Sequence, residues 1–590
     1  MATTNGSHSR PKVLIPEKVS PDGLRLLQES LDVEEKKGLT PDQLLDIIGE
    51  YDALIVRSET KVTSALLSAG KKLKVVARAG VGVDNVDLEA ATKLGIIVVN
   101  SPQGNINAAA EHTVALLMAV ARNIGGASLS IKAGKWERSQ LVGVEVKGKT
   151  LGILGLGKVG LTVARAAGGL GMTLVSYDPY ANPSLAAAAN VELVPSMDEL
   201  LEQADFLTIH TPMIASTKGI IGASELSKMK KSARILNVAR GGIVDENALL
   251  SALEVGTIAG AGMDVFTTEP PQPGDAASKL IEHPKVVATP HLGASTVEAQ
   301  ENVSIDVCTQ VISILSGQLP RSAVNAPIIL PEEYRTLQPF VTLLEKMGSL
   351  YTQHFGLSNS SQRMRTTFEL TYEGTLASTS NTKPLFASLV KGLVSPITSA
   401  DSLNINIVNA ELVAKERGIL ISEYKSRENL EQEGYAASVT LRARLDPRSP
   451  SASRRPNPTE STETERQRKI RDQVITGFVS NNQPYISRLG RFTCQFIPTG
   501  TMIICRNYDE PGKIGIVGGR LGKAGVNIRF MNVAPIEQNG DKLAVDSQPS
   551  GSQKENEALM ILGVDRPVDD DVKKGLIGGD GVLEANVVVL

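Results

Sequence analysis

Short apolar runs alternate with amphipathic stretches over the first hundred residues. The runs predict four strands, at Lys12–Pro16, Ala53–Val56, Lys74–Ala77 and Ile96–Val99. The amphipathic stretches predict four helices, at Pro21–Leu31, Thr40–Ile48, Ser64–Ala69 and Asp87–Leu94. Strands that alternate with helices at this spacing form a parallel sheet covered by helices on both faces. This part of the chain is therefore predicted to be a small α/β unit.

A second doubly wound α/β unit is predicted from residue 105 onward. It opens with a long, nearly all-apolar helix at Asn107–Ile124, which suits burial at an interface between domains or subunits. Six strands follow, at Thr150–Leu154, Met172–Tyr177, Phe206–His210, Arg234–Val238, Ala259–Asp264 and Val286–Thr289. A further helix, Ala299–Ser316, is expected to run back across the first unit. Residues 11–104 plus 296–326 would then form one domain and residues 105–295 the other.

The pattern changes after residue 317. A proline-containing linker leads into residues 327–500, which mix helix and strand and are predicted to form an α+β domain. Within it, residues 446–468 are rich in Pro, Ser, Thr and mixed charge, and this composition cannot bury enough apolar surface to fold. We predict a flexible insertion there, with a phosphate or phosphorylation site at Arg454 and Arg455 as the alternative.

Residues 501–590 read strand, helix, strand, strand, helix, strand. Strands are predicted at Thr501–Arg506, Val526–Val533, Ala558–Val564 and Val582–Leu590. Helices are predicted at Gly512–Ala524 and Val568–Gly575, and a polar loop at 535–557. This order is typical of the ferredoxin-like fold, a small sheet with helices on one face that tends to pair with another copy.

Composition and charge exclude several classes of function. The chain is 42% hydrophobic and 21% charged with a net charge of −3, so nothing indicates a nucleic-acid or membrane partner. Three widely separated cysteines offer neither a disulfide framework nor zinc-ligand spacing, so we expect no metal and a cytoplasmic location. Residues 1–10 are polar and are expected to be a disordered tail, although a very short organelle signal stays open.

The most informative stretch is Thr150–Gly160, which reads TLGILGLGKVG. An apolar strand leads into Gly155, Gly157 and Gly160, and a helical pattern follows, as in the Rossmann fingerprint for dinucleotides. The three glycines serve a tight turn, a close approach of backbone to the pyrophosphate, and packing of the helix on the strand. Asp178 ends the next strand, where its carboxylate accepts hydrogen bonds from ribose hydroxyls and repels a 2′-phosphate. The predicted cofactor is therefore NAD rather than NADP.

Candidate catalytic residues follow three successive strands. Arg240, Glu269 and His291 lie at the edge where a doubly wound sheet binds its ligands. Oxidation of a secondary alcohol needs a base, and the imidazole of His291 suits that role at neutral pH. A carboxylate beside it fixes the tautomer, and a guanidinium holds the carboxylate of a substrate. Each residue alone is more often a turn, loop or ion-pair residue, but together they predict a hydride-transfer site.

These motifs resemble those of the D-isomer-specific 2-hydroxyacid dehydrogenases over residues 12–326. The resemblance rests on GLGKVG at 155–160, NVARGG at 237–242, the segment from Asp264 to Glu269, and PHLGAST at 290–296. It implies that Arg240 is catalytic and binds substrate, that Glu269 partners the histidine, and that His291 is the acid–base. It also implies a set of cofactor-binding positions: Gly155, Gly157, Lys158, Val159, Gly160, Asp178, Thr211, Val238, Ala239, Asp264, Gly293, Ala294 and Val81. Val81 stands where some relatives carry Thr, so a hydroxyl contact to the cofactor is lost there.

The stretches IVRS at 55–58, RAGVGVDN at 78–85 and GKWER at 134–138 make the chain similar to members of that family that oxidise 3-phosphoglycerate. The implied substrate-binding residues are Arg57, Ser58, Arg78, Gly80, Asn105, Arg138, Arg240 and His291. Arg57 and Arg78 end strands of the first unit, so we favour a phosphate-binding role for them over surface salt bridges. Arg240 is not expected to reach this phosphate. Arg138 resembles an arginine that reaches into the neighbouring subunit, which implies a homo-oligomer, a dimer or a tetramer.

The last ninety residues resemble an ACT regulatory domain, with residues 327–500 as the intervening, allosteric substrate-binding-like domain of the long form. The resemblance implies L-serine as effector at Asn507, Asp509 and Asn527, with a domain that only dimerises as the alternative. Two other functions stay open. One is a sibling glyoxylate or hydroxypyruvate reductase, and the other is an NAD-sensing, co-repressor-like scaffold on the same fold.

Overall fold

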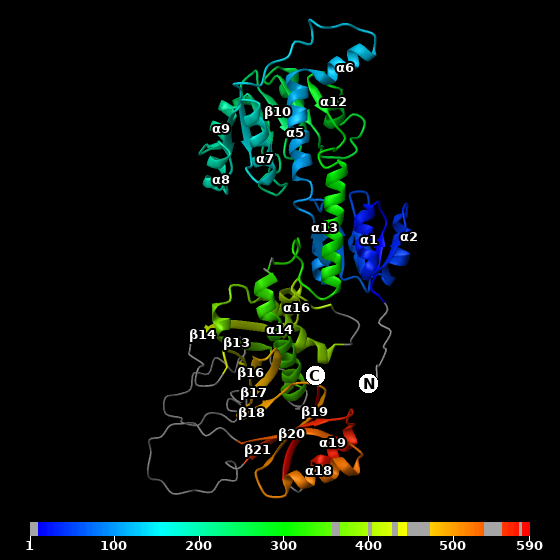
Figure 1. The fold of residues 1–590 in the computed structure, drawn as a ribbon, viewed down its shortest axis with the longest axis vertical. Coiled ribbons are helices and arrows are strands. Elements are labelled where there is room, and N and C mark those ends of the chain that lie inside the picture. Colours follow the sequence, from blue (N-terminus) through cyan, green and yellow to red (C-terminus); the bar gives the residue numbers. More distant parts are fainter. Residues whose placement is uncertain are drawn as a thin grey trace.

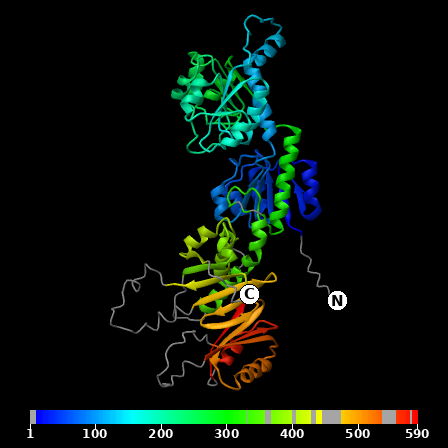
Figure 2. The same cartoon turned by 60° about the vertical axis from the view of Figure 1, so that its left-hand side comes forward.

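Four sheets follow one another along an elongated molecule (Figures 1 and 2). The computed structural model describes residues 10–327, 329, 331–356, 366–398, 404–426, 435–444, 473–535, 557–577 and 581–590. The predicted insertion at 446–468, residues 1–9 of the predicted tail and residues 536–556 of the predicted loop lie outside these ranges.

The first sheet is parallel, in the order β2-β1-β3-β4-β5. Its strands are β1 (Lys12–Ile15), β2 (Asp32–Glu35), β3 (Ala53–Val56), β4 (Val75–Arg78) and β5 (Ile97–Asn100). The helices between them are α1 (Pro21–Ser30), α2 (Pro41–Ile47), α3 (Ser64–Ala69) and α4 (Leu88–Lys93). The four predicted strands and helices are confirmed. The sequence did not indicate β2, because this edge strand reads Asp-Val-Glu-Glu and has no apolar run.

The second sheet is also parallel, in the order β12-β11-β10-β9-β6-β7-β8. Its strands are β6 (Thr150–Leu154), β7 (Thr173–Tyr177), β8 (Glu192–Leu193), β9 (Phe206–Ile209), β10 (Arg234–Asn237), β11 (Gly260–Met263) and β12 (Val286–Ala288). Its helices are α7 (Lys158–Gly169), α8 (Pro183–Ala188), α9 (Met197–Gln203), α10 (Ala223–Lys228), α11 (Glu246–Glu254) and α12 (Ala276–Glu282). The predicted doubly wound class is thereby confirmed for both units. Helix α13 (Val297–Leu315) leaves this unit and packs against α1 and β4 of the first sheet (Figure 1).

The single long helix predicted at Asn107–Ile124 is wrong in its extent. Helix α5 (Ile106–Ala121) ends before Asn123, whose φ of 52° is left-handed, and α6 (Ile124–Lys132) starts there at an angle of 66° to α5. Asparagine tolerates this conformation better than other side chains do, so it ends the helix where the apolar pattern continues. Among the described residues, no single helix is long and apolar enough to cross a membrane, and only this bent pair meets the length and composition test.

The third sheet has six strands in the order β14-β13-β15-β16-β17-β18. They are β13 (Thr367–Gly374), β14 (Leu420–Ser426), β15 (Ala437–Ala443), β16 (Val474–Ser480), β17 (Gln483–Leu489) and β18 (Phe492–Phe496). Helices α14 (Pro331–Tyr351), α15 (Lys383–Val394) and α16 (Ala410–Glu416) belong to the same unit. The α+β prediction for this part of the chain is confirmed.

The fourth sheet has the order β20-β21-β19-β22 and confirms the ferredoxin-like prediction. Its elements are β19 (Thr501–Tyr508), α18 (Lys513–Lys523), β20 (Ile528–Pro535), β21 (Glu557–Val564), α19 (Asp570–Leu576) and β22 (Val582–Val589). Side chains on one face of this sheet, such as Cys505 and Leu562, pack with the helices, whereas Ile504 and Ile561 on the other face join the core of the third unit. The face away from the helices is thus covered within the same chain.

Candidate active site

The turn after β6 has the geometry that the glycine motif predicts. Gly155 has a φ of 93°, in the region that favours glycine, and α7 begins three residues later. A Cβ atom added at Gly160 would lie 2.4 Å from the carbonyl oxygen of Gly155, so helix and turn are in close contact. A Cβ atom added at Gly157 would meet no described atom within 4 Å. The turn therefore presents open backbone and the N-terminus of α7 to an anion.

Asp178 and Thr211 lie at the same turn. Oδ2 of Asp178 accepts a hydrogen bond from the N–H of Leu156 at 2.8 Å, which holds the carboxylate beside the glycines. The methyl group of Thr211 would lie 3.0 Å from a Cβ atom added at Gly155. Its Oγ1 is buried and has no hydrogen-bond partner among the described residues. Buried hydroxyls are nearly always hydrogen-bonded, so this one fits a bound polar ligand such as a dinucleotide.

His291 and Glu269 form a hydrogen-bonded pair. Nδ1 of His291 lies 2.7 Å from Oε2 of Glu269, and Oε1 of Glu269 accepts from the N–H of Phe266 at 2.9 Å. The hydrogen bond to Glu269 raises the pKa of His291, although burial opposes it. Burial alone would raise the pKa of Glu269, but the bonds from His291 and Phe266 lower it. Because Nδ1 faces the carboxylate, Nε2 is the ring nitrogen left to exchange a proton with a substrate.

Arg240 extends from the second unit toward the first. Its Nη1 donates to the carbonyl oxygen of Ala239 at 2.6 Å, and its Nε lies 3.7 Å from Oδ2 of Asp84. A Cβ atom added at Gly82 would lie 2.6 Å from Nη2 of Arg240. The side chain of Asn237 shapes the loop, since it accepts from the N–H of Ala239 at 3.1 Å and donates to the carbonyl of Arg240 at 2.9 Å. The guanidinium thus bridges the cleft between the two units.

Arg78 and Arg57 belong to the same positive region. A Cβ atom added at Gly80 would lie 1.9 Å from Nη1 of Arg78, and Nε of Arg78 is buried without a partner among the described residues. Burial lowers the pKa of Arg78, and the positive charges of Arg240 and Arg57 lower it further. Arg240 therefore lies close enough to act on Arg78. Asp84 and Glu17 offset this repulsion in part, and an anionic ligand would neutralise the guanidinium groups further.

Glu17 is a residue of this region that the sequence analysis missed. It is 7% exposed, and its Oε1 accepts hydrogen bonds from the N–H groups of Arg57 at 3.0 Å and Thr60 at 2.9 Å. Asn85 donates to the carbonyl oxygen of Arg57 at 2.8 Å. These bonds hold the loop that carries Arg57 and the exposed Ser58. The available signal was a lone acid directly after β1, at the edge where ligand loops gather.

Asp264 holds the loop that carries His291. It is 1% exposed and accepts hydrogen bonds from the hydroxyl of Thr289 and the N–H groups of Leu292 and Gly293, at 2.6, 2.7 and 2.8 Å. Burial alone would raise the pKa of Asp264, but these bonds and one from His112 lower it. The sequence analysis did not single out His112, although a lone histidine in an apolar helix requires a polar partner.

Other predicted residues lie on or next to these loops. Lys158 and Val159 form the first turn of α7, and Asn105 precedes α5 without a side-chain capping bond. A Cβ atom added at Gly293 would lie 3.0 Å from Cγ1 of Val238. The carbonyl oxygen of Val81 accepts from Asn100 at 2.5 Å, and Ala294 follows Gly293 directly. Arg138 is exposed on the loop after α6 and forms no hydrogen bond or ion pair within the described part of the chain.

Comparison with known proteins decides the family. Residues 114–293 match the model of the D-isomer specific 2-hydroxyacid dehydrogenase NAD binding domain. Residues 336–452 match that of the D-3-phosphoglycerate dehydrogenase intervening domain. The chain is 41% identical over 581 residues to D-3-phosphoglycerate dehydrogenase 2, chloroplastic, of Arabidopsis thaliana, covering 98% of this chain and 87% of that protein. It is 39% identical to D-3-phosphoglycerate dehydrogenase of Synechocystis sp., covering 99% of this chain and 96% of that protein. It is 37% identical to D-3-phosphoglycerate dehydrogenase of Bacillus subtilis, covering 98% of this chain and 99% of that protein.

The chain belongs to the long-form D-3-phosphoglycerate dehydrogenase family. It is an NAD-dependent dehydrogenase, as the sequence analysis predicted. The family match also explains the third unit, because the intervening domain matches within residues 336–452.

The predicted effector site of this dehydrogenase lies at the start of its fourth unit. Asn507 is 2% exposed, its Nδ2 donates to the carbonyl oxygen of Tyr508 at 2.8 Å, and its Oδ1 is buried without a partner among the described residues. Asp509 and Asn527 are exposed. The N–H of Asn527 donates to Oδ1 of Asp565 at 3.0 Å. The structure thus places one buried and two exposed polar residues at these positions.

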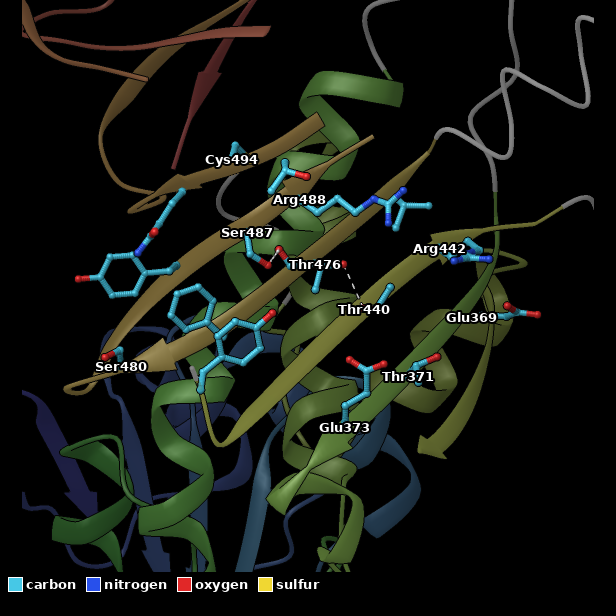
Figure 3. Close-up of a pocket in the computed structure, with 16 residues that line it drawn as sticks. Glu369, Thr371, Glu373, Thr440, Arg442, Thr476, Ser480, Ser487, Arg488 and Cys494 are labelled. Carbon is cyan, nitrogen blue, oxygen red and sulfur yellow. Dashed lines mark hydrogen bonds between the residues drawn. The ribbon is translucent and has the colours of Figure 1, made fainter. Parts of the chain in front are cut away.

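A hollow of about 850 Å³ lies on the open face of the intervening sheet (Figure 3). Hydroxyl-bearing side chains from several strands line it, with a hydrogen bond of 3.1 Å between Thr440 and Thr476. Phe478 is stacked between Tyr435 and Tyr485 with ring centroids 4.5 and 5.3 Å away. Arg442 and Arg488 also line the hollow (Figure 3). It contains neither residues of the NAD turn nor the His291–Glu269 pair.

Proposed function

We propose that this dehydrogenase oxidises 3-phospho-D-glycerate to 3-phosphohydroxypyruvate with NAD, the first step of L-serine biosynthesis. One observation carries the proposal: the guanidinium of Arg240 acts on both the buried Arg78 and His291 of the His291–Glu269 pair, and Arg57 also acts on Arg78. A substrate with a carboxylate and a phosphate places two anionic groups among these guanidinium groups. The names of the relatives support the same substrate.

The site residues divide the chemistry among them. NAD, when bound, accepts the hydride. Neutral His291 accepts the proton of the C2 hydroxyl at Nε2, and Glu269 stabilises the imidazolium through Nδ1. Arg240 holds the substrate carboxylate and polarises the C–O bond, while Arg57 and Arg78 bind the phosphate. Thr211, Asp178 and the glycine turn hold the cofactor, and Asp264 supports its nicotinamide end.

The proposed domains are those expected from the sequence. Substrate is bound by 11–104 with 296–326, NAD by 105–295, and regulation is assigned to an intervening domain at 327–500 and an ACT domain at 501–590. We propose that L-serine binds the ACT domain at Asn507, Asp509 and Asn527 and inhibits the enzyme. The three cysteines are buried and unbridged, which supports action in the reducing cytoplasm.

We also propose that the enzyme is a homo-oligomer in which Arg138 reaches the partner's active site. The segment around Arg138 is apolar and exposed in the single chain: Leu129 is 71%, Trp136 80% and Val142 77% exposed. Exposed apolar residues gathered in this way indicate an interface with another protein, here a second copy.

Two rival functions share the His291–Glu269 pair. A glyoxylate or hydroxypyruvate reductase has no use for Arg57 and Arg78 as a phosphate clamp, and a co-repressor-like scaffold has no need of turnover. Steady-state assays of the full chain with 3-phosphoglycerate and NAD, with and without serine, separate all three. Turnover on 3-phosphoglycerate supports the proposal, whereas turnover on glyoxylate alone, or none on either substrate, contradicts it.

The phosphate clamp makes a specific prediction. Arg57→Ala should raise the KM for 3-phosphoglycerate about 10- to 100-fold, since a charge-assisted hydrogen bond contributes about 1.5–3 kcal/mol. The KM for an unphosphorylated 2-hydroxy acid should change little. Lys61→Ala removes an exposed positive charge four residues further along the chain, is the matched control and should affect neither substrate strongly. Equal losses on both substrates in Arg57→Ala would place the phosphate elsewhere.

A further inference from the structure

The two domains of the catalytic half are joined by two segments of chain. Residues 101–105 lead from β5 into α5, and residues 289–296 lead from β12 into α13. His112 lies in the second turn of α5, and its side chain is 19% exposed. Asp264 and Thr289, which it contacts, follow β11 and β12. A single histidine thus connects the helix that follows the first segment to Thr289, the first residue of the second segment.

The hydrogen bonds define which atom donates. The hydroxyl of Thr289 donates to Oδ1 of Asp264 at 2.6 Å, so its oxygen is available as an acceptor. Nε2 of His112 lies 3.0 Å from that oxygen and 3.2 Å from Oδ1 of Asp264. Both neighbours accept, so Nε2 must carry a proton and donate to them.

The same carboxylate holds the backbone around His291. Asp264 accepts from the N–H groups of Leu292 and Gly293 through its side chain, and its own carbonyl oxygen accepts from the N–H of His291 at 2.9 Å. His291 has a φ of 54°, a left-handed conformation that costs about 1–3 kcal/mol for a residue other than glycine. Surrounding bonds must maintain such a conformation, and those of Asp264 do so here.

We propose that His112 is a positioning residue: its donation from Nε2 to Asp264 and Thr289 fixes the loop of His291 relative to the crossing helix α5. Because α5, Glu269 and His291 all lie within residues 105–295, the same bond keeps His291 against Glu269 inside this unit. This inference rests on the proposed function, in which His291 exchanges the substrate proton.

The test compares His112→Leu with His112→Gln in the full chain. Leucine fills the space without donating, whereas the Nε2 amide of glutamine keeps a donor at a similar reach. We expect His112→Leu to lower kcat for 3-phosphoglycerate about 10- to 100-fold, because small misplacements of a catalytic group cost this much. His112→Gln should recover most of that loss, and the Kd for NAD should change little in either variant. His283→Gln changes a half-buried histidine that follows α12 outside this network, is the control and should behave as wild type.

A second readout needs no turnover. Six histidines make the imidazole signals separable by NMR, so the titration of His291 can be followed directly. The groups that act on it are Glu269, Asp264 and Arg240. In His112→Leu the loop that carries His291 is held less firmly, so the hydrogen bond between His291 and Glu269 should weaken. The pKa of His291 should then fall toward its ordinary value, whereas His112→Gln should keep the raised pKa. An unchanged His291 titration in His112→Leu, or a glutamine variant no better than leucine, would overturn the proposal. A wild-type chain that shows the titration shift but no turnover would instead contradict the proposed function.

Discussion

At the scale of single residues, the active site depends on how charged groups perturb one another. The hydrogen bond that His291 donates to Glu269 raises the pKa of His291, whereas burial and the positive charge of Arg240 lower it. The arginines destabilise one another's charge instead, because Arg78 is buried and acted on by the positive charges of Arg240 and Arg57. The His291–Glu269 pair is electrostatically favourable without a ligand, whereas the arginines would be stabilised by a bound anion. In the proposed mechanism, Glu269 therefore orients His291 before substrate arrives, and the substrate supplies the anionic groups that the arginines lack.

Replacing Glu269 should shift the pH dependence in a defined direction. In Glu269→Gln the carboxylate that favours the imidazolium is gone, so the pKa of His291 falls. Oxidation needs neutral His291, and its acid limb in kcat/KM should move to lower pH. The reverse reduction needs the imidazolium, and it should lose activity at neutral pH. An acid limb that stays in place in pH–rate profiles would mean that His291 is not the titrating base.

His291→Ala is the companion variant. It should lower kcat by about 10²–10⁴-fold, as expected when a general base is removed, while NAD affinity stays nearly intact. An unchanged kcat would contradict the assignment.

At the scale of secondary-structure elements, the close contact of β6, its glycine turn and α7 forms the proposed cofactor site. Asp178 also holds the turn, because its carboxylate accepts a hydrogen bond from the N–H of Leu156. Two glycines of the motif have different surroundings: Gly160 touches the turn, while Gly157 faces open space. The same motif therefore contains one position that serves packing and one that serves the ligand.

Two alanine variants separate these roles. Gly160→Ala should destabilise the protein by about 1–3 kcal/mol, because its Cβ atom overpacks the turn, and should weaken NAD binding as well. Gly157→Ala should leave the melting temperature nearly unchanged but weaken NAD binding strongly, because its methyl group occupies space that the pyrophosphate needs. Calorimetric unfolding and NAD titration measure both quantities. Equal loss of stability in the two variants would contradict this division.

At the scale of the whole molecule, the four units are joined by contacts between neighbours. The carbonyl oxygen of Gly95 in the first unit accepts hydrogen bonds from Nδ2 of Asn404 at 3.0 Å and Nδ2 of Asn406 at 2.7 Å in the intervening domain. That domain in turn shares a hydrophobic core with the fourth sheet, and Arg491 forms an ion pair with Glu557 across the boundary. A continuous series of contacts therefore links the fourth unit to the substrate-binding side.

The contact at Gly95 can be broken without touching the active site. A Cβ atom at Gly95 would lie 2.0 Å from the carbonyl oxygen of Asn404, so Gly95→Ala should separate the intervening domain from the first unit. Gly38→Ala is the matched control: its φ of 76° is similar to the 69° of Gly95, but a Cβ atom there meets nothing within 4 Å. We expect faster proteolysis of the linker between residues 317 and 327 and a larger radius of gyration only in Gly95→Ala. Identical behaviour of the two variants would mean that this contact does not hold the domains.

The sequence by itself determined the elements and the chemistry, because both are written in local patterns. Apolar periodicity located the strands of the two α/β units except β2 and β8, whereas helices α8 to α12 were not predicted individually. Strand-end position singled out Arg240, Glu269 and His291 as catalytic candidates, which stays a prediction. Only the tertiary structure decided which distant residues act on them. Glu17 and His112 have no local motif, and their roles arise because the fold brings them to the loops of Arg57 and His291. The break at Asn123 and the polar edge strand β2 depend on backbone conformation and on pairing with β1, which an apolar pattern does not encode.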